Sequence, residues 1–585
     1  MRKLFVFIIL IIGLGVGLAF DLANKGLVWQ FAWSVTGEEE PISQMRGVIE
    51  WVGGGLRPQP NTQPMTPINH VNNSPYGINV FLNLEADPRK VDVQLRTIRE
   101  AGISWLRQQF SWHDIEIDGR GQFTDSRHDR NGDGIPDTIS AWDKYDFIVD
   151  TAIAYGFSFQ ARLDTSPAWS RSNPDSDDLG PPDDIQDFVN FAVAVAEHYK
   201  GRIHHYQIWN EPNIFPEWGP RDVSPEGYTD MLCRTYTALK AVDPNIVVIT
   251  AALAPTVSLT GRDLNDFIYL QRMYDAGAGA CFDIMAVQGY GLFSGPTDRR
   301  MRQTTTNIGR HIYIRDIMVN NGDAHKPIWI SEAAWNFVPT IEENPNVTGI
   351  RDQFGQVTMQ QAADYIVDYY QRAQEEWHWL GVINYWYFTR PDMAWANTPQ
   401  YYFRMAEPDF SDEHPYYTTL PVYEAVKDYI LTNRPMLYAG VHQSDDHWAI
   451  RYVGDNAPVE DATAQFGRAI NTDSLSFDVY TYHATAQMLV RWRGDSLQIC
   501  EYESCRYFSE TPSSDGWNWT VYPLEYANPL RISLSKNGTS PLVIDSITIV
   551  NRQSSAQWGN IVLGIIGGLM TIIVILDILR GRARD

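Results

Sequence analysis

Eight short apolar runs, each followed by a longer amphipathic or polar stretch, occupy positions 75–434 of this chain. A short apolar run bounded by turn residues is typical of a buried strand, and a longer amphipathic stretch is typical of a helix. Strands that alternate with helices form parallel sheets, and eight such repeats predict a closed (β/α)8 barrel. The expected strands are 76–82, 105–110, 158–163, 203–209, 246–251, 284–288, 328–332 and 382–387, and the expected helices include 88–101, 141–155, 183–199, 225–242, 305–320 and 360–377.

A second, smaller domain, 435–550, is expected after the barrel. Its apolar residues come in short runs that Gly, Asn, Asp and Ser separate, and the helical pattern stops. This pattern is typical of a small all-β sandwich. The expected strands are 449–453, 475–482, 486–492, 497–501, 530–535 and 542–550.

Both ends of the chain are apolar. Positions 1–20 hold an apolar run behind two basic residues, which fits a cleaved signal peptide and an uncleaved N-terminal anchor equally well. Positions 559–576 lack charge and predict a transmembrane helix over 558–579, and the arginines of 580–585 favour a cytoplasmic tail. We therefore expect a protein of the cell membrane whose folded domains face the extracellular side.

Between the N-terminal run and the barrel, positions 21–74 show only weak periodicity. The part 57–69 is rich in Pro, Gln, Thr and Asn, a composition typical of connecting segments. We expect 21–74 to be a juxtamembrane segment and linker.

Charge and cysteine content narrow the class of protein further. The formal net charge is −25, from 46 basic and 71 acidic residues, which disfavours a nucleic-acid partner because phosphates would be repelled. Of the four cysteines, Cys500 and Cys505 flank a four-residue loop and predict a disulfide outside the cytosol. Cys233 and Cys281 fall in the barrel region, where we expect buried thiols.

Two carboxylates end two of the expected strands. Glu211 lies in Trp209-Asn210-Glu211-Pro212, directly after the run 202–209, and Glu332 follows another apolar run. The carboxyl ends of barrel strands share one face, where active sites form. Glycosidic bond cleavage needs such a pair, one acid to protonate the leaving oxygen and one carboxylate at the anomeric carbon. Most of the 71 acidic residues are expected to be solvated surface charges.

The stretch 206–213, which reads Tyr-Gln-Ile-Trp-Asn-Glu-Pro-Asn, and Trp218 resemble the strand-4 motif of clan A glycoside hydrolases. The stretch 329–335 resembles their strand-7 segment. The resemblance covers 75–434 and is greatest to family 39, which holds β-xylosidases and α-iduronidases, with family 5 next. It implies that Glu211 is the general acid/base, that Glu332 is the nucleophile of a retaining mechanism, and that Asn210 binds the sugar 2-hydroxyl.

The resemblance also implies roles for residues at other strand ends. Arg107 resembles the arginine that orients the nucleophile, Tyr290 the tyrosine that hydrogen-bonds it, and Trp386 the tryptophan floor of the −1 subsite. Gln288 departs from the pattern, because family members often carry histidine there. A glutamine can still bind substrate but cannot titrate. Trp169, after the third strand, and Trp335 are the tryptophans we expect to stack on sugar rings.

A run of oxygen-bearing side chains at 129–137 resembles the aspartate-rich calcium loops of extracellular proteins. Its spacing follows the start of an EF-hand loop, but the final glutamate of that motif is replaced by Ser140. The alternative is an ordinary Asn-Gly/Asp-Gly turn. The candidate ligands of a structural Ca²⁺ are Asp129, Asn131, Asp133, Ile135 (through its carbonyl) and Asp137.

The leading hypothesis is a membrane-anchored retaining glycosidase that needs no cofactor for catalysis and acts on an extracellular oligo- or polysaccharide. A non-catalytic glycan-binding barrel is the second hypothesis, although a binder has no need of both Glu211 and Glu332. A transglycosidase is the third, and it differs from a hydrolase only in its acceptor. Loss of turnover after removal of either carboxylate separates the first hypothesis from the second.

Overall fold

A computed structural model of the chain describes residues 2–127, 129, 134–173, 179–349, 351–409, 416–481 and 485–551. The chain divides into two compact units, Met1–Arg434 and Pro435–Asp585. The N-terminal apolar run forms helix α1 (Arg2–Ala23), and the expected transmembrane helix over 558–579 lies outside the described residues. None of the helices in the described ranges combines the length and apolar character that crossing a membrane requires.

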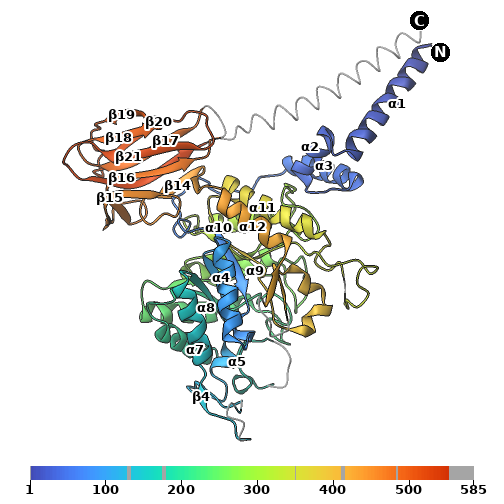
Figure 1. The fold of residues 1–585 in the computed structure, drawn as a ribbon, viewed down its shortest axis with the longest axis vertical. Helices are drawn as coiled ribbons and strands as arrows, with labels where there is room; N and C mark the ends of the chain where they lie inside the picture. Colours follow the sequence, from blue (N-terminus) through green and yellow to red (C-terminus); the bar gives the residue numbers. More distant parts are fainter. Residues whose placement is uncertain are drawn as a thin grey trace. The chain divides into compact units, whose positions relative to one another are not determined.

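The first unit contains a closed parallel barrel, as the sequence predicts (Figure 1). Its eight strands pair in the order β7-β6-β5-β2-β1-β10-β9-β8. Parallel bridges from Ile249 to Ile284 and from Leu253 to Val287 join the two outer strands and close the barrel. The strands are β1 (Tyr76–Val80), β2 (Trp105–Ser111), β5 (Ser158–Asp164), β6 (His205–Ile208), β7 (Val247–Ile249), β8 (Met285–Gln288), β9 (Ile328–Ala333) and β10 (Leu380–Tyr385).

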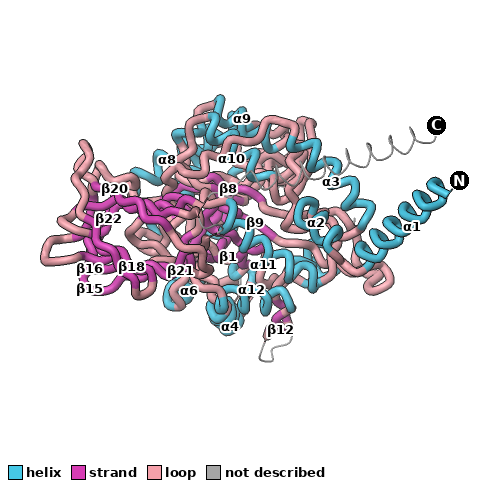
Figure 2. The backbone as a smooth tube through the Cα atoms, turned by 90° about the horizontal axis from the view of Figure 1, so that it is seen from above, coloured by secondary structure: helices cyan, strands magenta, loops and turns pink. Residues whose placement is uncertain are grey.

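Helices surround the barrel, and Figure 2 shows α4, α9, α10 and α11 around β1, β8 and β9. Most begin at a capping side chain that accepts a hydrogen bond from a free backbone N–H, as Ser224 does for α8. The sequence did not predict α9 or α12. The helices are α4 (Pro88–Glu100), α6 (Asp143–Ala154), α7 (Ile185–His198), α8 (Pro225–Val242), α9 (Asp266–Asp275), α10 (Arg310–Asn320), α11 (Met359–Glu376) and α12 (Pro421–Thr432).

Shorter elements occupy the connections of this unit. A hairpin of β3 and β4 lies in the long loop after β2, and a second hairpin of β11 and β12 precedes α12. The remaining elements are α5 (Trp112–Ile115), β3 (Thr124–Asp125), β4 (Ile139–Ser140), β11 (Ala406–Pro408), β12 (Tyr417–Thr419) and the 3₁₀ turns η1 (Leu82–Leu84), η2 (Ala168–Ser170), η3 (Ala278–Ala280), η4 (Met393–Asn397) and η5 (Pro399–Phe403).

The interior of the barrel has an apolar layer and a polar layer. The apolar layer consists of Trp105, Val247, Ile249, Ala252, Ile284, Ala286, Trp329 and Val382. Residues two apart on a strand share a face, so the next inward positions on β2, β9 and β10 are Arg107, Ser331 and Asn384. All three are buried. The polar layer therefore lies nearer the carboxyl ends of the strands, directly below the two predicted carboxylates.

Positions 21–74 are not simply a linker, because residues 27–55 form two helices, α2 (Leu27–Thr36) and α3 (Pro41–Gly55). The backbone N–H of Gly295, in the loop after β8, donates to the carbonyl of Gly37 at 2.8 Å. Tyr365 of α11 donates to Glu39 at 2.8 Å. The buried face of α3 carries Gln44 and two glycines instead of apolar side chains, so it gave no amphipathic pattern in the sequence.

The second unit is all-β, as expected, and its sheet folds around one apolar core. Strand β16 pairs with β22 through its first part and with β21 through its last part. The sequence missed β13, β14, β19 and β20. The strands are β13 (Met436–Leu437), β14 (Gly440–Gln443), β15 (Arg451–Glu460), β16 (Arg468–Val479), β17 (Gln487–Arg493), β18 (Leu497–Glu501), β19 (Ser504–Phe508), β20 (Asn518–Pro523), β21 (Leu530–Lys536) and β22 (Leu542–Val550).

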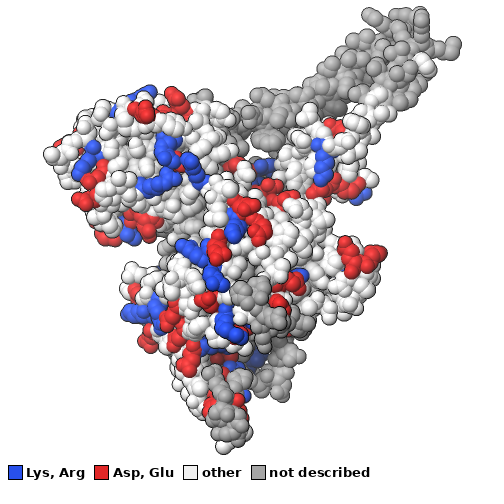
Figure 3. Space-filling model, in the orientation of Figure 1, with Lys and Arg blue, Asp and Glu red and all other residues white. Residues whose placement is uncertain are grey.

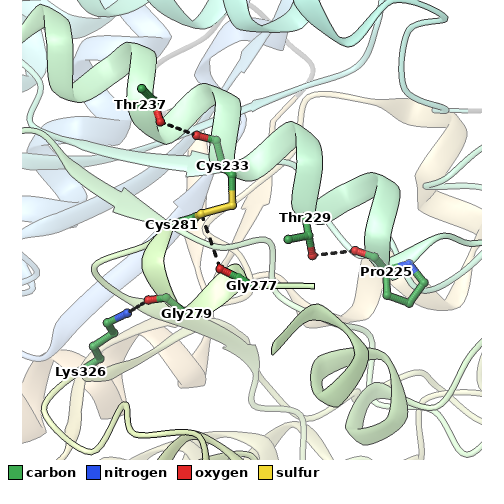
Figure 4. Close-up of a disulfide and its surroundings, with 8 residues drawn as sticks. All are labelled: Pro225, Thr229, Cys233, Thr237, Gly277, Gly279, Cys281 and Lys326. Carbon is green, nitrogen blue, oxygen red and sulfur yellow. Dashed lines mark hydrogen bonds between the residues drawn. A yellow bond between two sulfur atoms is a disulfide. The ribbon is translucent and has the colours of Figure 1, made fainter. Parts of the chain in front are cut away.

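All four cysteines are in disulfides. Cys500 and Cys505 face each other across β18 and β19, as predicted. The prediction of buried thiols for Cys233 and Cys281 is wrong, because these residues form a disulfide between α8 and the residue after η3 (Figure 4). Their Cα atoms lie 4.8 Å apart although 48 positions separate them in the sequence. Such a pairing depends on helix packing, which residue spacing does not reveal.

Charged side chains are mixed over the surface that Figure 3 draws, where basic residues lie beside acidic ones. The ion pair between Arg272 and Glu226, at 2.7 Å, is one exposed example. Because exposed pairs of this kind contribute only about 0.2–1 kcal/mol each, we assign stability mainly to the two apolar cores.

Candidate active site

The strand-4 motif continues directly from β6, and its backbone has an unusual conformation. Trp209 has a φ of 71° and Glu211 a φ of 40°, in the left-handed region that non-glycine residues seldom adopt. Backbone bonds hold this turn: Trp209 N–H donates to Leu163 O, and Glu211 N–H donates to Ala252 O, both at 3.0 Å. Two neighbouring strand ends thus fix the direction of the Glu211 side chain. Strained backbone of this kind is concentrated at functional sites.

Glu332, in β9, is bound by two donors. Arg107 Nη1 donates to its Oε1 at 2.8 Å, and the Tyr290 hydroxyl donates to its Oε2 at 2.8 Å. The side chains of Arg107 and Glu332 are 1% and 7% exposed, so the ion pair is shielded from water. Both oxygens of the carboxyl group are therefore held in place by hydrogen bonds.

Arg107 also connects Glu332 to the neighbourhood of Glu211. Its Nη2 donates to Asn210 Oδ1 at 3.0 Å, and its Nε donates to Gln207 Oε1 at 2.8 Å. Its Nη1 further donates to Asn79 at 2.7 Å. One guanidinium therefore spans the carboxyl ends of β1, β2, β6 and β9, which brings the predicted residues of distant segments into one cluster.

Glu211 has the properties of a proton donor. Burial, first of all, and the negative charge of Glu332 raise its pKa, while the hydrogen bond that Gln288 Nε2 donates to Glu211 Oε1 at 2.7 Å and the positive charges of Arg107 and Arg162 lower it. The net result is a pKa raised to about 7. The carboxyl group can therefore hold a proton near neutral pH. Gln288, the departure from the family pattern, contacts Glu211 directly.

The three predicted tryptophans differ in what they can contact. Trp386, directly after β10, is half-buried and lies edge-on to Phe81 with ring centres 5.5 Å apart. Trp169 is half-buried too, and its indole N–H donates to Glu116 O at 2.9 Å. Trp335 is only 1% exposed and donates to Ser294 O at 2.8 Å. Its ring has no open face for a sugar, because a core position encloses it.

Several residues of the cluster were not predicted from the sequence. Glu217 lies in the loop after the strand-4 motif, and Asn210 Nδ2 donates to its Oε1 at 3.4 Å. Burial, together with the charge of Glu211, raises the pKa of Glu217 to about 8. Arg162 and Asp164 form an ion pair at 2.7 Å at the end of β5. Their only sequence signal is proximity to strand ends, which many structural residues share.

The predicted calcium loop is only partly described. Asn131 and Asp133 lie outside the described residues. Asp129 accepts a hydrogen bond from the backbone N–H of Gly134 at 2.7 Å, as in a turn, and Ile135 and Asp137 follow it. In the described part of the chain, no cluster of three or more His, Cys, Asp or Glu side chains forms a potential metal site. The calcium ion stays a prediction.

Three of the solved structures that this chain resembles are glycoside hydrolases. A family 39 glycoside hydrolase from Bacteroides cellulosilyticus is 15% identical, with 80% of this chain and 82% of that chain covered and a TM-score of 0.43. A family 39 β-xylosidase from Caulobacter crescentus is 14% identical, with 81% and 98% covered and a TM-score of 0.42. A family 5 enzyme from Streptomyces cattleya is 15% identical, with 61% and 80% covered and a TM-score of 0.43.

No family model matches the sequence of this chain, and no curated protein does. The functional conclusion below rests on the side chains around Glu211 and Glu332 and not on these similarities.

Proposed function

We propose that this chain is a retaining glycoside hydrolase in which Glu332 is the nucleophile and Glu211 the general acid/base. The observation that carries this proposal is the contrast between the two carboxyl groups. Glu332 accepts hydrogen bonds from a guanidinium and a phenol, one on each oxygen. Glu211 has a pKa raised to about 7, so it can hold a proton at neutral pH. Divergent environments of this kind mark acid and base assignments.

The proposed reaction has two steps. In the first, a Glu332 oxygen attacks the anomeric carbon, the bond to the leaving oxygen breaks, and Glu211 gives its proton to that oxygen. In the second, Glu211 removes a proton from water, whose oxygen attacks the anomeric carbon and releases Glu332. The same group can serve both steps because a pKa near 7 lets it donate and accept protons at similar cost. No cofactor takes part.

The substrate we propose is an extracellular oligo- or polysaccharide. Asn210 is placed beside Glu211 with its amide held by Arg107, which suits recognition of a sugar hydroxyl next to the reacting carbon. Half-buried Trp386 suits an apolar floor for the same ring.

The test uses Glu211→Ala and Glu332→Ala on a panel of aryl glycosides. We expect Glu332→Ala to lose at least about a thousandfold in kcat and to regain turnover with azide, giving a glycosyl azide of inverted configuration. Glu211→Ala should lose most on poor leaving groups, and azide should give a product of retained configuration. Glu197→Ala, on the exposed face of α7, is the control.

Unchanged turnover in either variant contradicts the assigned roles. Binding of glycans by the wild type without turnover of any glycoside supports a binding barrel instead. Sugar transfer to an added glycan in preference to water identifies a transglycosidase.

We also propose that the barrel faces the extracellular side of the cell membrane, held by the segment 558–579. The apolar ends of the sequence and the two disulfides support this, since disulfides persist in oxidising compartments. Protease added to intact cells should remove the barrel, and the enzyme should sediment with membranes. Recovery of the full-length chain in the soluble cytosol contradicts the proposal.

A further inference from the structure

Glu217 is a third carboxyl group beside the proposed acid, and the mechanism above does not use it. It lies six positions after Glu211, in a loop that returns to the strand-4 motif. Trp209 Nε1 donates to the backbone carbonyl of Glu217 at 2.9 Å. Trp218 N–H donates to Ile214 O at 3.2 Å in the same loop. The motif itself therefore fixes the backbone of Glu217.

The Glu217 carboxyl contacts Asn210, which is the proposed ligand of the sugar hydroxyl. Arg107 carries only donors, so Asn210 must turn its oxygen toward that guanidinium. The amide nitrogen then faces Glu217, whose Oε1 accepts from it at 3.4 Å. Asn210 is held between Arg107 on one side and Glu217 on the other, which leaves one amide hydrogen for a substrate.

The charges around Glu217 favour an uncharged carboxyl group. Glu211, Asp164 and Glu332 contribute negative charge, and Arg162 contributes positive charge. Arg162 is already paired with Asp164 at 2.7 Å. Burial and the charge of Glu211 raise the pKa of Glu217 to about 8, so the group can hold a proton at neutral pH. A neutral carboxyl can accept from Asn210 through its carbonyl oxygen without placing another negative charge beside the acid.

We propose that Glu217 is a positioning residue, which acts uncharged and holds the Asn210 amide in the direction that binds a sugar hydroxyl. This inference rests on the proposed function. It predicts that Glu217 contributes to turnover only through Asn210, and only for substrates that carry the hydroxyl that Asn210 binds.

The test compares the best aryl glycoside of the wild-type panel with its 2-deoxy analogue. On the glycoside with the hydroxyl, Glu217→Ala should lower kcat/KM by about 10- to 30-fold, the value of one side-chain hydrogen bond in a buried site. On the 2-deoxy analogue, Glu217→Ala and wild type should agree within about twofold. Glu217→Gln keeps a neutral acceptor and should stay within about threefold of wild type below about pH 7.

A second comparison uses Asn210→Ala alone and together with Glu217→Ala. If Glu217 acts through Asn210, the double variant should be no slower than Asn210→Ala. Thermal unfolding midpoints of all variants, with Glu197→Ala as the surface control, establish that each one folds.

The outcomes separate this inference from the proposed function. Turnover by the wild type with an equal Glu217→Ala loss on both substrates overturns the inference alone, as does an additive double variant. A loss in Glu217→Gln as large as in Glu217→Ala shows that the ionised carboxylate is needed, and also overturns it. Absence of wild-type turnover on every glycoside overturns the proposed function and the inference together.

Discussion

At the scale of single residues, the site depends on Arg107, because one guanidinium contacts both the proposed nucleophile and the residue next to the proposed acid. Its bonds to Glu332 and Asn210 measure 2.8 and 3.0 Å. A buried arginine must have all its donors satisfied, and here Asn79 and Gln207 take the remaining contacts. Arg107 therefore fixes the relative positions of Glu332 and Asn210, the two groups that it connects.

The pH dependence of turnover follows from Glu211. This group must be protonated to act as acid, so kcat/KM should fall about tenfold per pH unit as pH rises above about 7. Gln288 lowers the pKa of Glu211 by donating to the ionised form. Gln288→Leu removes that donor, so the pKa should rise and the basic limb of the profile should move to higher pH. Profiles of kcat/KM measured across pH 5–10 check this.

Gln360→Leu is the matched control, because Gln360 is an exposed residue of α11 bonded to Asp364. Its profile should coincide with that of the wild type. A basic limb that moves to lower pH in Gln288→Leu would show that Gln288 does not stabilise the ionised form of the acid.

Residues that belong to the strands and to the segments directly after them were predictable, and residues brought in by longer loops were not. Glu211 and Glu332 follow from their places at predicted strand ends, whereas Arg107 and Tyr290 were identified through the family resemblance. The structure places all four in the same cluster. Glu217 owes its place to a loop that returns to the motif, which no local pattern encodes. Trp335 follows β9 closely, yet the loop after β8 covers its ring.

At the scale of elements, successive inward positions of a barrel strand differ: one packs in the apolar core, and the next belongs to the polar layer below the site. Trp105 and Arg107 on β2, and Trp329 and Ser331 on β9, place an apolar and then a polar residue on the inward face. This ordering keeps the apolar core away from the carboxyl ends, where water and substrate must enter. Alternation with a period of two residues is visible in the sequence. The sequence does not show which of the two alternating sets of residues faces the barrel interior, because both faces of these strands are buried.

The helix pair α2–α3 makes a contact that tolerates no side chain. Gly37 has a φ of 62°, and a Cβ built there would lie 2.6 Å from the carbonyl oxygen of Gly295. Gly37→Ala should therefore weaken the docking of both helices by about 1–3 kcal/mol, from strain and displaced backbone. Amide hydrogen exchange in α2 and α3 should become faster by the factor that corresponds to this loss of free energy.

Gly53→Ala provides the comparison, since Gly53 lies in α3 with no atom within 4 Å of a built Cβ. It should be neutral or stabilise α3 by about 0.5–1 kcal/mol, because alanine favours helices. Equal exchange rates in the two variants would mean that the contact with Gly295 does not hold the helix pair.

The disulfides should differ in what they contribute to stability. The Cys233–Cys281 bridge closes a segment of 48 positions and the Cys500–Cys505 bridge one of 5. Loop-closure entropy then predicts losses of about 4 and about 2 kcal/mol when each pair is replaced by alanines. Denaturant unfolding of the two double variants measures this. A larger loss for the Cys500–Cys505 pair would show that closure entropy does not govern these bridges.

Element boundaries were predictable where apolar runs were continuous, as in the eight barrel strands. The missed elements lack that signal. Helix α3 buries a face of Gln44, Gly47 and Gly54, so its packing depends on close backbone approach instead of apolar area. Strand β19 has almost no buried side chain, because it lies at one edge of its sheet.

At the scale of the whole molecule, each unit has a core of its own. The barrel holds the cluster that includes Trp105 and Trp329, and the all-β unit holds one that includes Phe477 and Ile532. Every residue assigned to catalysis belongs to the first unit. Two separate cores predict two cooperative transitions, and chemistry confined to one unit predicts that turnover follows only one of them.

Ile532→Ala tests this separation. The side chain is fully buried in β21, so its truncation should lower the unfolding free energy of the all-β unit by about 2–5 kcal/mol. Because neither carboxylate lies in that unit, kcat/KM should stay at the wild-type value while the barrel is folded. Ile330→Ala is the counterpart, since Ile330 is fully buried in β9, two positions before Glu332.

Ile330→Ala should lower the unfolding free energy of the barrel by a similar amount. It should lower turnover as well, because the strand that carries the proposed nucleophile loses its packing. Thermal unfolding followed by fluorescence, with aryl glycoside turnover measured at each temperature, compares the two variants. If Ile532→Ala lost turnover at temperatures where the barrel transition has not begun, the all-β unit would be part of the catalytic apparatus, and chemistry would not be confined to the barrel.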